Sequence, residues 1–144
     1  DALQYIANPS ERVQMAAVKS NYLSLRYIQN PTLDILKAAV LQDPQAMRQI
    51  TNLDLDTVVE LLKVSTLILG YVPKQIGLTV DMVRQIITEM IANPAVEDRY
   101  VREIVSNPAI GGRQSTWPID VLSLVDAYGS IEAKKIAIDQ YLLY

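Results

Sequence analysis

The chain has 144 residues, of which 50% are apolar and 20% are charged, and its formal net charge is −3. This length and composition suit one folded domain of ordinary size and not a disordered chain. Proteins that bind the nucleic-acid backbone usually carry an excess of basic residues, and this chain has none. The sequence contains no Cys and no His, which excludes disulfides, thiolate metal sites and the commonest general base.

Two segments near the N-terminus share one frame. They read YIANPSERVQMAAV over residues 5–18 and YIQNPTLDILKAAV over residues 27–40, and they lie 22 residues apart. Aligning Leu3 with Leu25 gives eight identities in 22 positions, and the register continues more faintly through Met47 and Leu69. A fixed period of this size indicates a repeat architecture. Because the chain opens inside a repeat and without Met, we interpret it as a piece of a longer protein.

Each repeat predicts a short helical turn followed by a longer helix. We expect the longer helices to start at Asn-Pro, because Asn caps free backbone N–H groups and Pro suits the first helical position. Glu11 falls in capping-box position after Asn8. The predicted long-helix starts are Asn8-Pro9, Asn30-Pro31, Asn93-Pro94 and Asn107-Pro108. Asp43-Pro44 predicts the start of one short helix.

Each predicted long helix carries an apolar triplet at i, i+3 and i+4, which is typical of one buried helical face. Ala16, Ala17, Ala38 and Ala39 are small, so we expect them to be buried where neighbouring helices nearly touch. Later triplets contain bulkier residues. In order, the triplets are Val13/Ala16/Ala17, Ile35/Ala38/Ala39, Val58/Leu61/Leu62, Val83/Ile86/Ile87, Val101/Ile104/Val105 and Val121/Leu124/Val125.

A last helix is predicted over residues 131–143, with four residues on its buried face: Ala133, Ile136, Ala137 and Tyr141. No sustained alternation of apolar and polar residues indicates a sheet. The predicted fold is therefore all-α. A short helix-pair repeat solenoid over residues 1–90 grades into an irregular C-terminal helical bundle over residues 91–144. We expect this bundle to cap the solenoid within one continuous domain.

The frame in residues 2–50 resembles a family of short helical repeats of unknown function from bacteriophages and large DNA viruses. Residues 8–18, NPSERVQMAAV, are similar to the N-P-S-E-x-V-x-x-A-A-V core of those repeats. The layout is also similar to leucine-rich-variant and HEAT-like repeats. The resemblance implies a viral repeat scaffold in the host cytoplasm or the virion, and it supplies no catalytic residues. It fades after Asn52, and residues 91–144 resemble no family we can name.

Tyr5, Tyr27 and Tyr71 occupy the same repeat position, with Gln49 in the gap. Such a ladder either grips a partner, since Tyr offers rigid apolar area with a polar tip, or lines the core between repeats. Arg26 and Arg48 are likewise one period apart. They form either a ridge that binds phosphate or carboxylate groups or an ordinary solvated face.

One clear loop, AIGGRQSTWP, spans residues 109–118. Its glycine pair lies beside Arg113, but no G-K-[ST] follows, so the spacing of a phosphate-binding loop is absent. We expect the loop to be either a plain linker or a contact point for a protein, through Arg113 and Trp117. The most apolar run, residues 58–72, is interrupted by charges and is shorter than the roughly 20 residues of a membrane span. We therefore expect no membrane contact.

We predict no catalytic, metal-binding or cofactor-binding residues. Ser and Thr have no His partner, and carboxylate pairs such as Asp54/Asp56 and Glu97/Asp98 do not share one helical face. The favoured function is a non-enzymatic protein-binding or structural module whose partner is a host or viral protein or another subunit of an assembly. The alternative is a nucleic-acid-binding HEAT-like module with a basic ridge of Arg12, Lys19, Arg26, Lys37 and Arg48.

Overall fold

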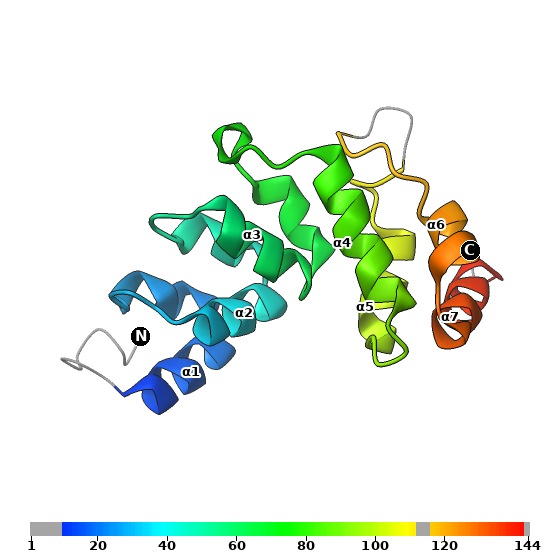
Figure 1. Ribbon diagram of the computed structural model, residues 1–144. Coiled ribbons are helices and arrows are strands. Elements are labelled where there is room, and N and C mark those ends of the chain that lie inside the picture. Colours follow the sequence, from blue (N-terminus) through cyan, green and yellow to red (C-terminus); the bar gives the residue numbers. More distant parts are fainter. Residues whose placement is uncertain (1–9, 112–115, 143–144) are drawn as a thin grey trace. The chain divides into compact units, whose positions relative to one another are not determined.

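The computed structural model describes residues 10–111 and 116–142, with side chains through Gln140 (Figure 1). Over these residues the chain forms seven α-helices, four 3-10 helices and no strand, so the all-α prediction is confirmed. The chain divides into two compact units, Asp1–Ile76 and Gly77–Tyr144.

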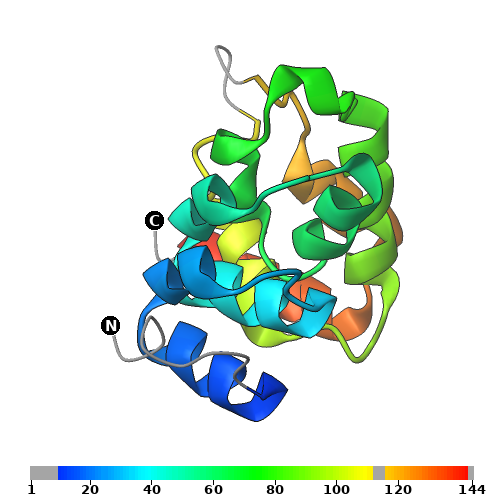
Figure 2. The ribbon, with the colours of Figure 1, turned by 90° about the vertical axis from the view of Figure 1, so that its left-hand side faces the viewer.

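The first unit contains three helix pairs, each a long α-helix followed by a short 3-10 helix. Successive long helices pack against each other, and so do successive short helices. Figure 2 shows the two rows, with the long helices on one side of this unit and the short helices on the other. The pairs are α1 (Glu11–Ser20) with η2 (Tyr22–Tyr27), α2 (Leu33–Gln42) with η3 (Pro44–Gln49), and α3 (Leu55–Leu62) with η4 (Thr66–Tyr71). A further short helix, η5 (Lys74–Ile76), follows.

The caps of the long helices recur every 22 residues, at Ser10, Thr32 and Asp54. Each cap side chain accepts a hydrogen bond from the backbone N–H three residues later, at 3.3, 3.3 and 2.8 Å. These bonds satisfy donors that the first helical turn leaves free. The period seen in the sequence is therefore also a period of helix starts.

The caps of the short helices follow the same spacing, at Asn21, Asp43 and Ser65. Here each side chain accepts from the backbone N–H two residues later, at 3.0, 2.9 and 3.2 Å. The predicted start of a short helix at Asp43-Pro44 is confirmed, since Pro44 is the first residue of η3.

The predicted long-helix start at Asn30-Pro31 is wrong by two residues, because Thr32 is the cap of α2. Asn30 has a φ of +50° and Asn52, one period later, a φ of +57°. Asn tolerates this left-handed conformation better than most residues. The two asparagines therefore turn the chain from a short helix toward the next long one. Asn8-Pro9 lies outside the described residues.

The predicted starts at Asn93 and Asn107 are also wrong, since both residues follow the end of a helix. They are the C-caps of α4 (Val80–Ala92) and α5 (Asp98–Ser106). Their side chains accept from the N–H groups of Ala95 and Ala109, both at 2.9 Å. An Asn side chain bonded two residues ahead, with Pro between, favours a turn. The same dipeptide therefore ends a helix here.

The burial predicted for the alanines is confirmed only in part. Ala39 is fully buried, but Ala17 and Ala38 are half-buried and Ala16 is exposed. The buried face of α2 is centred between Leu36 and Ala39, which places Ala38 at its edge. Ala16 is the equivalent residue of α1.

α1 is the first of the described long helices, and its apolar face is less buried than that of α2. Val13 is 40% exposed, whereas Ile35, its counterpart one period later, is 0% exposed. α2 packs against both α1 and α3. Among the described long helices, α1 packs mainly against α2, and Val13 on its apolar face stays partly exposed.

The second unit is an irregular bundle of α4, α5, α6 (Val121–Tyr128) and α7 (Ile131–Leu142). α4 packs against α6, α5 against α7, and α6 against α5 and α7. Most of α4 falls within residues 1–90, which we assigned to the solenoid, and α4 packs against α6, which belongs to the C-terminal part of the chain.

The core of this bundle comes largely from the predicted triplets. Its buried members include Val83, Ile86, Ile87, Val101, Ile104, Val121 and Val125. Leu124 and Val105 are half-buried. On α7, Ala133 and Ala137 are buried and Ile136 is half-buried, while the side chain of Tyr141 lies outside the described residues. None of the described helices is long and apolar enough to cross a bilayer.

Candidate functional site

The last two residues of η2, η3 and η4 occupy equivalent positions in the three helix pairs. They are Arg26-Tyr27, Arg48-Gln49 and Gly70-Tyr71. Since the caps hold the short helices in one register and neighbouring short helices pack together, these positions recur along one row. We call the surface made by these six residues the short-helix ridge.

Much of the ridge is accessible. Tyr27 is 40% exposed, Arg26 and Arg48 are exposed, and Gln49 and Tyr71 are half-buried. The predicted correspondence of Tyr27 and Tyr71 is thus retained, whereas Tyr5 lies outside the described residues. A ring that is partly packed and partly exposed offers apolar area at little entropic cost. The binding role of these tyrosines stays a prediction.

One contact joins two neighbouring steps of the ridge. The guanidinium carbon of Arg48 lies 5.1 Å from the centroid of the Tyr71 ring. This distance is within the range of a cation–π interaction. One repeat earlier, Arg26 is the counterpart of Arg48 and Gln49 is the counterpart of Tyr71, and Gln49 has no ring. Arg48 is therefore held over an aromatic face.

The ridge has a local positive charge. Arg26 and Arg48 are the only charged residues within η2, η3 and η4. Most acidic residues of the first unit lie on or next to the long helices instead, among them Asp34, Asp54 and Glu60. Among the described residues, neither Arg26 nor Arg48 lies within ion-pair distance of a carboxylate.

The carboxylates of the long helices are engaged locally. The side-chain and backbone hydrogen bonds from Thr57 lower the pKa of Asp54. A hydrogen bond from Lys63 lowers the pKa of Glu60, and the two side chains lie 2.8 Å apart. These groups are ionised at neutral pH and serve their own helix, which leaves the ridge arginines available.

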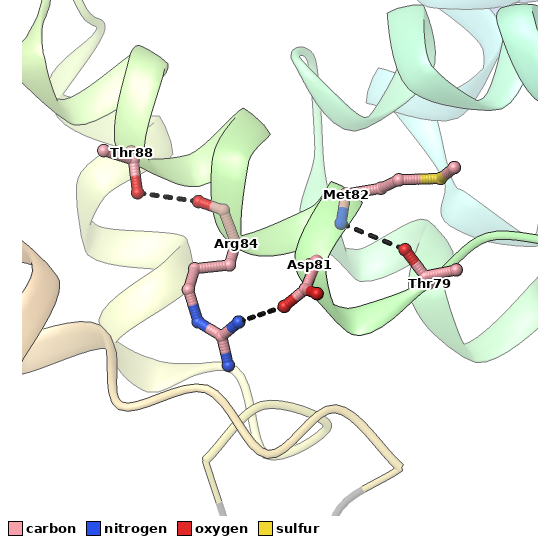
Figure 3. A network of polar contacts seen from close by, with 5 residues as sticks. All are labelled: Thr79, Asp81, Met82, Arg84 and Thr88. Atoms are coloured by element: carbon pink, nitrogen blue, oxygen red, sulfur yellow. Dashed lines mark hydrogen bonds and ion pairs between the residues drawn. The ribbon is translucent and has the colours of Figure 1, made fainter.

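Arginines in the second unit differ in this respect. The guanidinium of Arg84 lies 2.6 Å from the carboxylate of Asp81. Figure 3 shows this ion pair, the cap of α4 by Thr79 and the hydrogen bond from Thr88 to the carbonyl of Arg84. Arg102 pairs with Asp98 at 2.9 Å. These arginines have carboxylate partners on their own helix. The ridge arginines are thus distinguished by chemistry as well as by position.

The predicted contact point in the loop is described only in part. Arg113 lies outside the described residues. Trp117 is half-buried, and its carbonyl accepts from the N–H of Gly111 at 3.0 Å. Gly111 has a φ of +86°, and a Cβ there would lie 3.0 Å from the carbonyl oxygen of Ile119. The backbone at Gly111 thus packs closely against the backbone of Trp117 and Ile119. Trp117 belongs to the second unit, whereas the ridge belongs to the first.

A second exposed surface was not predicted. Tyr128 is 59% exposed, Ile131 71% and Ile138 59%. Ile131 and Ile138 are two helical turns apart on α7, away from Ala133 and Ala137, so they share one outer side of the helix. The seven-residue spacing of these two isoleucines could have predicted that they share one face of the helix.

The carboxylate pairs do not assemble into a larger cluster. Asp54 caps α3, and Glu97 and Asp98 lie near Arg99 and Arg102 respectively. Within the described part of the chain, no group of three or more acidic residues is placed to hold a metal ion. The non-enzymatic role remains a prediction.

No protein-family model, curated protein or solved structure matches this chain. The resemblance to viral repeats therefore stays a prediction.

Proposed function

We propose that this chain is a non-enzymatic helical-repeat module that binds a protein through the short-helix ridge. The three helix pairs would form part of a solenoid, of phage or viral origin as the sequence resemblance implies. The partner would be a host or viral protein or another subunit of an assembly. The main observation in support is that the exposed residues Arg26, Tyr27 and Arg48 lie at equivalent ends of neighbouring short helices.

The chemistry of the ridge supports this proposal. Tyr and Arg are over-represented among residues that dominate binding energy at protein interfaces. Stacked helix pairs create extended surfaces with equivalent positions at regular intervals, which suit an extended partner. In addition, the Arg48–Tyr71 contact pre-orients one guanidinium, which reduces the entropy lost when a partner binds.

The nucleic-acid alternative is less well supported by the positions of the cations. Arg12 and Lys19 lie on α1 and Lys37 on α2, whereas Arg26 and Arg48 lie on the short helices. The five residues are therefore divided between two rows of helices. A duplex would need them along one continuous ridge. Nucleic-acid binding would also show a steep loss of affinity with salt.

The proposal is tested by comparative affinity capture from cells that produce the protein. Three baits are compared by quantitative mass spectrometry: wild type, Tyr27→Ala and Tyr128→Ala. Tyr128 is a matched control, because it is an exposed tyrosine of the second unit. We expect a protein whose recovery falls with Tyr27→Ala but not with Tyr128→Ala. For purified partner, Tyr27→Ala should weaken binding by about 1–2 kcal/mol.

A urea melt separates the binding role from a core role. Tyr27→Phe should leave the urea midpoint almost unchanged. If Tyr27→Ala mainly unfolds the unit and the folded fraction binds normally, Tyr27 is a core residue and the proposed surface is wrong. Recovery that disappears after nuclease treatment would favour the nucleic-acid alternative.

A further inference from the structure

We propose that the short-helix ridge binds an acidic peptide in a polyproline II conformation, with a carboxylate at every third residue. This inference rests on the proposed function and names the chemistry of the partner. It follows from three properties of the ridge: its charge, its spacing and its rings.

The charge of the ridge calls for an anionic partner. Arg26 and Arg48 are exposed and, among the described residues, form no ion pair, while no acidic residue lies within η2, η3 or η4. A guanidinium has a planar array of donors that matches a carboxylate through two parallel hydrogen bonds. Each step of the ridge that bears an arginine can therefore accept one carboxylate from a partner.

The spacing of the steps selects the conformation of the partner. Packed helices lie about 8–10 Å apart, and η2 packs against η3 as η3 packs against η4. A polyproline II helix returns to the same face every three residues, a rise of about 9 Å. A β-strand returns every second residue, at about 7 Å, so its side chains would lose register with the steps. The polyproline II repeat therefore matches the general spacing of packed helices better than the strand repeat does.

The aromatic residues beside the arginines suit the same conformation. Proline-rich segments dock on surfaces lined by aromatic rings, and their low conformational entropy favours binding. Tyr27 is exposed next to Arg26, and Tyr71 lies beneath Arg48. The ridge thus combines rings for the peptide backbone with cations for its carboxylates.

The test uses two synthetic peptides of identical composition, both labelled with a fluorophore. One contains four Glu-Pro-Pro units, and the other has its four glutamates in one block followed by the prolines. Fluorescence anisotropy with the whole chain measures binding. We expect the spaced peptide to bind about ten-fold more tightly than the blocked one, as for one additional charge-assisted hydrogen bond.

Matched arginine variants localise the site. Arg26→Gln and Arg48→Gln should each weaken the spaced peptide about ten-fold. Arg12→Gln, which removes an exposed arginine from α1, should leave its affinity unchanged. A gain-of-function variant is also available, because Gly70 occupies the third arginine position and a Cβ there would meet no atom within 4 Å. Gly70→Arg should strengthen binding of the spaced peptide.

Several results would overturn the inference. Equal binding of the two peptides, or equal effects of Arg12→Gln and Arg48→Gln, would indicate non-specific charge attraction. Tighter binding of a single-stranded oligonucleotide of equal charge would favour a nucleic-acid partner. If Arg48→Gln lowers the urea midpoint and leaves peptide affinity unchanged, the arginine only stabilises the end of its helix.

The outcomes of the two tests are separable. If affinity capture depends on Tyr27 but neither peptide binds, the acidic-peptide inference fails and protein binding stands. If capture is independent of Tyr27, the proposed surface itself fails.

Discussion

The guanidinium of Arg48 lies over the ring of Tyr71, with 5.1 Å between the guanidinium carbon and the ring centroid. Arg48 is the penultimate residue of η3, and Tyr71 is the last residue of η4. The contact therefore joins two successive helix pairs within the surface that we propose as the binding site.

A double-mutant cycle should detect this contact in the folded protein. Arg48→Ala and Tyr71→Leu, separately and together, should give a coupling energy of about 0.5–1 kcal/mol in urea unfolding, as for exposed cation–π pairs. Arg26→Ala with Gln49→Leu is the matched control, since that step has no ring and should show no comparable coupling. Coupling near zero for Arg48 and Tyr71 would mean that the contact adds nothing to stability.

Ala39 should be sensitive to added volume, because it is fully buried between helices. Ala39→Leu should lower the free energy of unfolding by about 1–3 kcal/mol through overpacking. Ala16→Leu makes the same chemical change at an exposed position of α1 and should stay within about 0.5 kcal/mol of wild type. Equal urea midpoints for the two variants would contradict the packing described for α2.

Two helix caps should make stability depend on acidic pH. Hydrogen bonds from Thr57 lower the pKa of Asp54, and hydrogen bonds from Ser123 lower the pKa of Asp120. A pKa lowered by folding contributes stability above the unfolded pKa, and this contribution disappears as pH falls through the folded value. The urea midpoint should therefore decrease below about pH 4.

Replacing both caps by asparagine separates charge from capping. Asn remains a good cap but does not titrate. The double variant Asp54→Asn/Asp120→Asn should therefore lose less stability than wild type between pH 7 and about pH 3. An undiminished loss in this variant would assign the acid sensitivity to other carboxylates.

Gly129 should tolerate no side chain, although its φ of −66° is ordinary. A Cβ at this residue would lie 2.5 Å from the carbonyl oxygen of Val125, the oxygen that accepts its own N–H. Gly129→Ala should therefore destabilise the second unit by more than ~1 kcal/mol. Gly70→Ala, at a site without close neighbours, should be neutral or slightly stabilising. Thermal melts of the two variants make the comparison.

The 22-residue period was readable in the sequence, because the repeated frame supplies equivalent capping positions. Ser10, Thr32 and Asp54 all accept a hydrogen bond from the N–H three residues later, although the first two accept through a hydroxyl and the third through a carboxylate. Local hydrogen-bonding chemistry determined the register of the helices. The all-α class was determined by apolar residues spaced for one helical face.

The role of Asn-Pro was not determined locally. Asn30 turns the chain before a helix, whereas Asn93 and Asn107 follow the end of one. Asn both caps helices and closes turns, and Pro is compatible with either. Whether Asn-Pro precedes or follows a helix depends on where the neighbouring apolar residues are buried.

Burial and contact between repeats were decided only by the tertiary structure. Ala17 and Ala39 occupy equivalent positions one period apart, yet Ala17 is half-buried and Ala39 is buried, because α2 packs against two long helices while α1, at the end of the described row, packs mainly against one. Arg48 and Tyr71 are far apart in the sequence and meet because η3 packs against η4. Sequence periodicity places equivalent residues in equivalent positions, but the number of packed neighbours decides which of them face a core and which remain exposed.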